Sequence, residues 1–187
     1  MVRPILFLFL STALLGGCSD SRPPVSGAPS GGDFVLQSAA GPLDTRALRG
    51  KVLMIYFGYS HCPDVCPASL GVDAQALTAL APKERAKTRL IFVSVDPERD
   101  SPALLKDYAA FFHPEMIGVT GTPEEIAVVA KAFGAGYLRQ PPDAAGNYAV
   151  DHSAHTYLVA PDGRLAATLP IGTSAAETVA AIRKLLP

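Results

Sequence analysis

The 187-residue chain has almost no net charge, only three cysteines and no long apolar segment. Its 16 basic and 17 acidic residues give a formal net charge of -1, so the composition excludes a strongly basic surface for nucleic acid. The apolar run at residues 5–15 would extend roughly 16 Å as a helix, about half of a bilayer core, which is too short to span. No internal repeat is visible. These absences leave one ordinary globular domain with a short extension.

The first 18 residues are typical of a targeting segment. An apolar run follows Arg3, as in signal peptides. The sequence Leu15-Gly16-Gly17-Cys18 resembles the bacterial lipobox, in which cleavage precedes a cysteine that carries diacylglycerol. We therefore expect a lipoprotein signal peptide at residues 1–17 and lipidation of Cys18. The alternative is an ordinary signal peptide followed by an unpaired cysteine, which would be a liability outside the cytoplasm.

Residues 19–32 are mostly Ser, Gly and Pro, with almost nothing apolar to bury. This composition predicts a flexible tether. Residues 18–32 would then connect a lipid anchor to a folded domain at residues 33–187. We expect the domain to lie on the periplasmic side of a membrane in a bacterial cell envelope.

Strands and helices alternate from residue 33 onward. Apolar runs rich in β-branched and aromatic residues at 51–59 and 89–95 predict strands that are buried on both faces. Helices are expected at residues 67–80, at 101–112, and from 122, where cap residues and Pro in the first turn mark the starts. The remaining expectations are strands at 34–36, 116–120, 156–160 and 164–168, a loop or hairpin at 137–149, and a last helix from 173 or 174. This order predicts an α/β fold with a mixed central sheet and helices on both faces.

Cys62 and Cys66 directly follow the strand expected at residues 51–59. A helix N-terminus lowers thiol pKa values, so we expect at least one of the two to be partly ionised, and a thiolate both attacks disulfides and binds metals. Residues i and i+4 of a helix have Cβ atoms about 5–6 Å apart, whereas a disulfide needs about 3.5–4.5 Å. The spacing therefore favours a metal site. A Cys62–Cys66 disulfide stays possible if Cys62 precedes the first helical turn.

A dithiol at the first strand-to-helix junction makes the expected fold thioredoxin-like. Thioredoxin-type reductants have a cis-proline before the strand that faces the dithiol, whereas this chain has Asp151-His152-Ser153-Ala154-His155. An imidazole from His152 would complete a site with two sulfurs and one nitrogen. Such a donor set suits copper, Cu(I) especially, or zinc.

Four segments together resemble the Sco/SenC family of copper-binding, thioredoxin-fold proteins. They lie within residues 34–186 and comprise 57–67, 95–102, 112–121 and 150–153. The resemblance implies that Cys62, Cys66 and His152 bind a copper ion. It also implies a role in assembling cytochrome c oxidase, by delivering copper to the CuA-bearing subunit or another copper acceptor, or by reducing its cysteines. Ser60 and Val119 depart from the usual Thr and Leu, and neither is a ligand.

Other polar residues near these motifs have simpler interpretations. We expect structural roles for three further histidines, His61, His113 and His155. Asp96 and Asp100 both match the family pattern. Asp96 either supports the site or caps a helix, Asp151 either orients His152 or caps a turn, and Asp64 adds charge.

Two functions compete on this sequence. The main hypothesis is a membrane-tethered copper chaperone. The alternative is an enzyme, a thiol-disulfide oxidoreductase in which Cys62 and Cys66 form the catalytic redox pair and reduce the acceptor protein. A thiol peroxidase is a third option, which the motifs do not favour.

Overall fold

The computed structural model describes residues 29–187. The expected signal peptide and the lipidation of Cys18 therefore lie outside the described residues. Within residues 29–187, no helix is both long and apolar enough to cross a bilayer.

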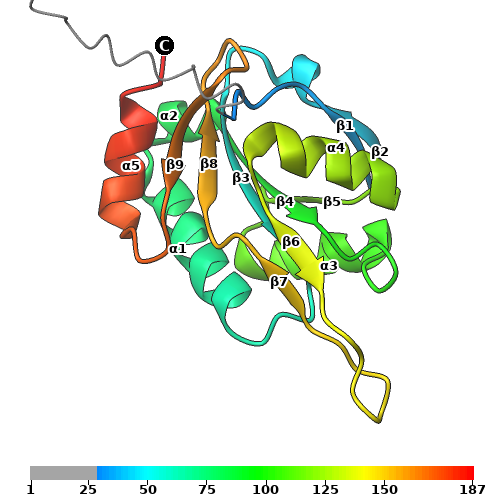
Figure 1. Ribbon diagram of the computed structural model, residues 1–187. Helices are drawn as coiled ribbons and strands as arrows, with labels where there is room; N and C mark the ends of the chain where they lie inside the picture. The colour runs from blue at the N-terminus through cyan, green and yellow to red at the C-terminus, as the bar shows by residue number, and fades with distance from the viewer. Residues whose placement is uncertain (1–28) are drawn as a thin grey trace, which may run out of the picture.

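A five-stranded mixed sheet forms the centre of the domain, with the strand order β5-β4-β3-β8-β9 (Figure 1). Strand β3 pairs in parallel with β4, and β4 with β5, whereas β8 runs antiparallel to both β3 and β9. The strands are β3 (Val52–Gly58), β4 (Thr88–Ser94), β5 (Ile117–Val119), β8 (Thr156–Val159) and β9 (Leu165–Leu169). The predicted mixed sheet is confirmed.

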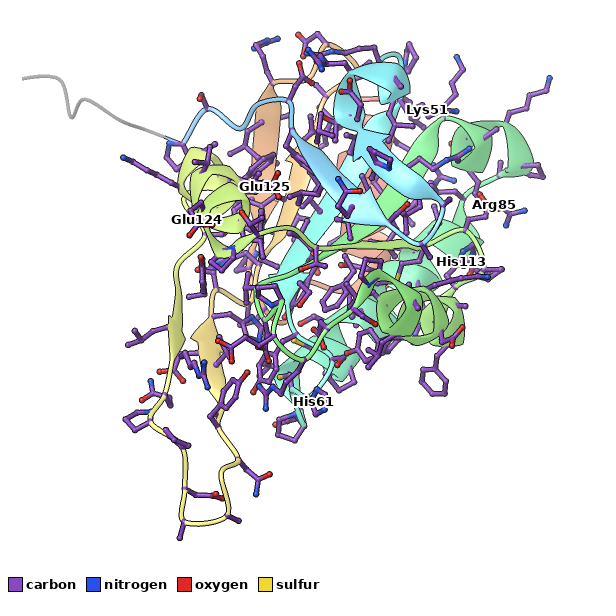
Figure 2. The ribbon with its side chains drawn as sticks, turned by 90° about the vertical axis from the view of Figure 1, so that its right-hand side faces the viewer. Lys51, His61, Arg85, His113, Glu124 and Glu125 are labelled. Atoms are coloured by element: carbon purple, nitrogen blue, oxygen red, sulfur yellow. The ribbon has the colours of Figure 1, made fainter. Side chains whose placement is uncertain are left out.

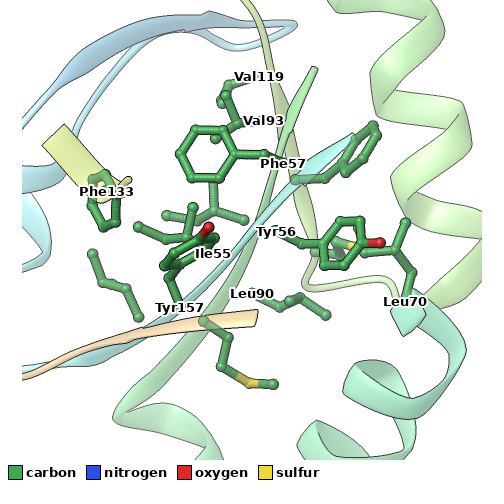
Figure 3. Close-up of a cluster of buried hydrophobic side chains, with 14 of the residues drawn as sticks. Ile55, Tyr56, Phe57, Leu70, Leu90, Val93, Val119, Phe133 and Tyr157 are labelled. Atoms are coloured by element: carbon green, nitrogen blue, oxygen red, sulfur yellow. The ribbon is translucent and has the colours of Figure 1, made fainter. Parts of the chain in front are cut away.

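Helices cover both faces of this sheet. The side chains of β3 alternate in direction and are buried along its whole length, so both faces need cover. Tyr56 points toward α1 (Val65–Ala79), whose Leu70 lies beside it, and Phe57 points the other way (Figure 3). The Phe57 ring lies 5.7 Å from that of Phe133 in α4 (Pro123–Phe133). Helices α3 (Pro102–Phe112) and α5 (Ala175–Arg183) flank α1. The predicted two-sided cover is confirmed.

Local capping signals set three helix starts as predicted. The side chains of Ser101, Thr122 and Ser174 accept hydrogen bonds from backbone N–H groups in the first turns of α3, α4 and α5. Helix α1 begins at Val65, before the expected residue 67, so Cys66 already lies within its first turn.

The sequence did not predict three short elements. They are α2 (Pro82–Ala86), a 3-10 helix at Thr45–Leu48, and β2 (Gly41–Asp44), which pairs with β1 (Val35–Ser38). Each has only four or five residues, too few to show a periodic pattern.

The predicted insertion is a hairpin of β6 (Tyr137–Arg139) and β7 (Val150–His152). It forms a sheet of its own and its tip extends beyond the rest of the domain (Figures 1 and 2). His152 is the last residue of β7, so the hairpin determines where this imidazole lies.

Residues at the end of the expected tether contact the domain. The N–H of Gly31 donates to the carbonyl of Ala132 at 3.0 Å, and the N–H of Leu165 donates to the carbonyl of Ser30 at 3.1 Å. The domain boundary at residue 33 stays a prediction.

A buried carboxyl lies on the inner side of α1. Asp73 is 2% exposed and its Oδ2 accepts a hydrogen bond of 2.7 Å from Thr156 Oγ1. Burial raises the pKa of Asp73 to about 7, although the Thr156 bond opposes the shift. The folded protein therefore holds this proton more tightly than the unfolded chain, where the pKa is about 3.9. The free energy of unfolding is consequently reduced as the pH rises from about 4 to 7.

Replacing Asp73 with Asn is expected to stabilise the protein by roughly 2–4 kcal/mol at pH 8, because Asn can still accept the Thr156 bond and carries no charge. Urea unfolding at pH 5 and pH 8 measures the effect, and the gain should be larger at pH 8. The matched control is Asp107→Asn on the exposed side of α3. An equal gain at both pH values would contradict the assignment.

Candidate metal centre

Three potential metal donors meet at one end of the sheet. The sulfurs of Cys62 and Cys66 and a ring nitrogen of His152 all lie within 4.8 Å of one another. Cys66 Sγ and His152 Nε2 lie 3.1 Å apart. Both cysteines are free thiols in this structure. The fold thus brings together the three residues that the sequence singled out, and the expected disulfide between Cys62 and Cys66 stays a prediction.

The two sulfurs are positioned by the turn between β3 and α1. The N–H of Cys62 donates to the carbonyl of Tyr59 at 3.2 Å, which folds the loop back on itself. The N–H of Cys66 points at Cys62 Sγ at 3.5 Å. Gly58 ends β3 directly beneath Cys66, and a Cβ at this position would lie 2.5 Å from Cys66 Sγ. Any larger residue at position 58 would displace the Cys66 sulfur.

The imidazole of His152 is held between two aromatic rings. The ring centroids of Tyr56 and Tyr59 lie 6.0 and 5.9 Å away, both edge-on. Nδ1 lies 3.4 Å from the carbonyl oxygen of Ser153, which places Nε2 toward the sulfurs. Burial lowers the pKa of His152, so the ring is neutral near pH 7. Neutral imidazole is the form that binds metals.

The thiol of Cys66 is more strongly buried than the sequence suggests. It is fully shielded from solvent, and burial raises the pKa of the Cys66 thiol above its usual value. At Cys66 the desolvation of the thiolate outweighs the helix dipole, and the expectation that at least one of the two thiols is partly ionised stays a prediction. A metal that binds here must displace the proton from this sulfur.

The spacing and chemistry of the three donors fit a soft ion. Sulfur lies about 2.3 Å and imidazole nitrogen about 2.0–2.1 Å from a bound ion such as zinc, so two ligands of one ion can be separated by up to about 4.6 Å. The cluster already lies close to that limit. Two thiolates and one imidazole select copper or zinc over hard cations such as Mg²⁺.

The other histidines stay outside this cluster. The side chain of His61 is half-exposed and lies 3.0 Å from Ser60 Oγ, near the end of the molecule that carries the hairpin (Figure 2). His155 lies against the ring of Tyr157, and His113 Nδ1 accepts the N–H of Glu115 at 3.0 Å. These positions agree with the structural roles expected for them.

The acidic residues divide into two groups. Asp96 and Asp100 are both buried: Asp100 accepts hydrogen bonds from Ser60, and Asp96 accepts one from the hydroxyl of Tyr148. Both therefore contact the segments that carry the donors. The cap of α3 is Ser101, and neither aspartate has that role. The Asp151 carboxylate accepts a bond from Gln140 Nε2, whereas the Nδ1 contact of His152 is with Ser153.

Tyr148 and Arg99 had no predicted role, although the structure places both beside this centre. The available signal was an aromatic residue that follows the turn-rich part of the insertion, four positions before His152.

Comparisons with known proteins agree with this geometry. The SCO1/SenC family model matches residues 23–187. Protein SCO2, mitochondrial, of Saccharomyces cerevisiae is 41% identical over 137 residues, which cover 72% of this chain and 45% of that protein. Protein SenC of Rhodobacter capsulatus is 45% identical over 136 residues, which cover 72% of this chain and 60% of SenC. The chain thus spans about half the length of these curated relatives.

Solved structures show the same fold. The structure of Bradyrhizobium japonicum ScoI with copper bound is 39% identical, covers 83% of this chain and 99% of that one, and has a TM-score of 0.76. A SCO1/SenC family lipoprotein from Bacillus anthracis is 25% identical over 89% of this chain and 99% of its own, with a TM-score of 0.70. The structure of BsSco is 25% identical, covers 83% of this chain and 94% of that one, and has a TM-score of 0.67. BsSco is described as having a disulfide switch and as a member of the Sco family of cytochrome c oxidase assembly proteins. The thioredoxin-like fold class is confirmed.

Proposed function

Because the chain belongs to the SCO1/SenC family, we propose that it is a copper carrier in the assembly of cytochrome c oxidase. The observation that carries this proposal is the meeting of Cys62, Cys66 and His152 within 4.8 Å. Copper is the cargo of these three side chains. The copper-bound ScoI structure, with the same fold at 39% identity, supports the choice of metal.

The chemistry of loading and release follows from the donor set. Each thiol gives up a proton as its sulfur binds the ion, while neutral His152 binds through the nitrogen that faces the sulfurs. Thiolates of an acceptor protein can then replace Cys62 and Cys66 one at a time. We propose the CuA-bearing subunit of cytochrome c oxidase as that acceptor, in line with the assembly role stated for BsSco.

We also propose that the chain is a lipoprotein anchored to an envelope membrane through Cys18. The support is the lipobox-like sequence at residues 15–18 and the Bacillus anthracis family member described as a lipoprotein. The Rhodobacter SenC relative favours a bacterial envelope protein, while other relatives are mitochondrial. The periplasmic side of the membrane is part of the same proposal.

The test is the stoichiometry of Cu(I) binding by the full chain. The reduced protein is titrated against a chromophoric Cu(I) chelator, and the copper retained is measured by elemental analysis. We expect one tightly held copper per chain. A chain that keeps no copper against the chelator would contradict the proposal.

A second function, reduction of a disulfide in the acceptor, is favoured by one observation: both cysteines are free thiols that lie within 4.8 Å of each other. One thiolate would attack the acceptor disulfide to form a mixed disulfide and release an acceptor thiol. The second cysteine would then displace the other acceptor thiol, so that the pair ends oxidised and the acceptor reduced. The disulfide switch named for BsSco supports this alternative.

A further inference from the structure

One turn touches both halves of the metal centre, although none of its residues is a metal donor. This bracket turn, residues 96–100, directly follows the carboxyl end of β4, beside the end of β3. Toward the cysteines, the Asp100 carboxylate accepts the N–H of Ser60 at 2.9 Å and also its hydroxyl. Ser60 lies two residues before Cys62. The buried Asp100 therefore fixes the loop that carries the first sulfur.

The other side of the bracket turn holds the β6–β7 hairpin through Tyr148. The hydroxyl of Tyr148 donates to Asp96 Oδ1 at 2.7 Å, and Arg99 Nη1 donates to the carbonyl of Tyr148 at 2.9 Å. The guanidinium carbons of Arg99 and Arg139 lie 3.6 and 3.8 Å from the centre of the Tyr148 ring. Two guanidinium groups this close must lie on opposite faces, so the ring is stacked between them.

Arg99 also connects this stack to the cysteine loop. Its guanidinium carbon lies 5.4 Å from the ring centre of Tyr59, whose ring is nearly perpendicular to that of His152. Arg99 Nη2 is buried without a hydrogen-bond partner among the described residues, which fits a guanidinium held by aromatic faces. Its Nε donates to the buried Asp96. A single guanidinium thus contacts the turn, the hairpin and the cysteine loop.

The hairpin is held by contacts with the rest of the domain, which include the buried side chain of Val150 and the Tyr148 stack. Its strands have three residues each and pair only with one another within the described residues. An isolated two-stranded hairpin is marginally stable in water. The ion pair between Arg139 and Glu98 is exposed and contributes little. The stack of Tyr148 on Arg99, with 23% of the Arg99 side chain exposed, is better shielded from water.

We propose that the bracket turn is a positioning element, and that the Tyr148–Arg99 contact keeps His152 facing the two sulfurs. This inference rests on the proposed copper site but adds residues outside the donor set. When the contact is broken, the hairpin samples positions in which Nε2 lies away from the sulfurs. The apparent dissociation constant for copper then rises in inverse proportion to the remaining population of the competent position.

The test compares Tyr148→Leu, which removes the stack and the hydroxyl, with Tyr148→Phe, which keeps the stack. We expect Tyr148→Leu to weaken Cu(I) affinity by about 10–100-fold, the range typical of residues that orient a metal ligand, and to speed copper release. Tyr148→Phe should stay within a few-fold of the wild type. Phe111→Leu is the matched control, because Phe111 is an exposed aromatic residue on α3 (83% exposed).

A second readout uses the metal-free full chain. Hydrogen exchange should become faster in Tyr148→Leu at amides that close the hairpin, such as the N–H of Ser153 that donates to Gly136, and stay unchanged in β3. Arg99→Lys should have the same effect, since an ammonium keeps the charge but cannot stack in the same way. It serves as the second variant if Tyr148→Leu also loosens β3.

Unchanged copper affinity together with unchanged hairpin exchange in both variants would overturn the positioning role. The outcome is separable from that of the copper proposal. If the wild type binds no copper, the proposed function fails, while hairpin exchange in the metal-free chain still decides whether Tyr148 and Arg99 hold the hairpin.

Discussion

Replacing Cys62 and Cys66 together with serine is expected to abolish stoichiometric copper binding by the full chain. The two sulfurs are the soft donors of the cluster, and a serine hydroxyl is a hard oxygen that keeps its proton at neutral pH. Only one imidazole remains, so we expect the affinity for Cu(I) to fall by roughly a thousand-fold or more. Titration against a chromophoric Cu(I) chelator measures the loss.

Two controls make this result specific to the site. Serine is close to cysteine in size, so far-UV circular dichroism and thermal unfolding should show that the double variant is folded. Cys18→Ser removes the remaining cysteine of the chain and should keep one copper per protein. Near-normal affinity in the double variant would end the copper proposal, whatever the geometry of the three side chains.

The two cysteines could be predicted from the sequence because their signal is local: Cys62 and Cys66 directly follow an apolar strand. His152 lies 86 residues from Cys66 and was predicted from the segment that faces the dithiol in thioredoxin-like folds and from the resemblance to the Sco/SenC family. Helix starts such as Ser101 and Thr122 were predictable from local signals, since a cap bonds only to the first turn of its own helix.

What the sequence could not predict depends on contacts between distant segments. Tyr148 and Asp96 are 52 residues apart, and neither position alone indicates that one binds the other. The burial of a side chain also depends on distant segments. The helix start favours an ionised Cys66, whereas the packing of β3 and α1 around this sulfur favours the thiol. The energetic balance at the site therefore required the structure.

The same two thiols serve both candidate functions, so the cysteines cannot separate a copper carrier from a reductase. A carrier needs a third donor, and a reductase does not. In this fold the third donor comes from a hairpin that is separate from the central sheet, on a different segment from the redox pair. His152 is accordingly the residue at which the two functions diverge.

Replacing His152 with alanine is expected to weaken Cu(I) affinity by about 100-fold or more while leaving disulfide exchange by Cys62 and Cys66 largely intact. Loss of a residue that merely orients a ligand costs about 10–100-fold, so loss of the ligand itself should cost at least as much. Disulfide exchange needs only the two sulfurs, which stay in place on the β3–α1 turn. Chelator competition measures the first quantity, and the rate of reduction of a disulfide-bonded peptide measures the second.

His155→Ala is the matched control, because it removes an imidazole three residues away that lies outside the donor cluster. It should change neither quantity by more than a few-fold. If His152→Ala kept wild-type copper affinity, the nitrogen 3.1 Å from Cys66 Sγ would not be a ligand. If that variant also reduced the peptide at the wild-type rate, with or without copper, the balance would shift to the reductase. Loss of affinity with retained reduction would instead assign His152 to the metal and leave the dithiol able to perform both reactions.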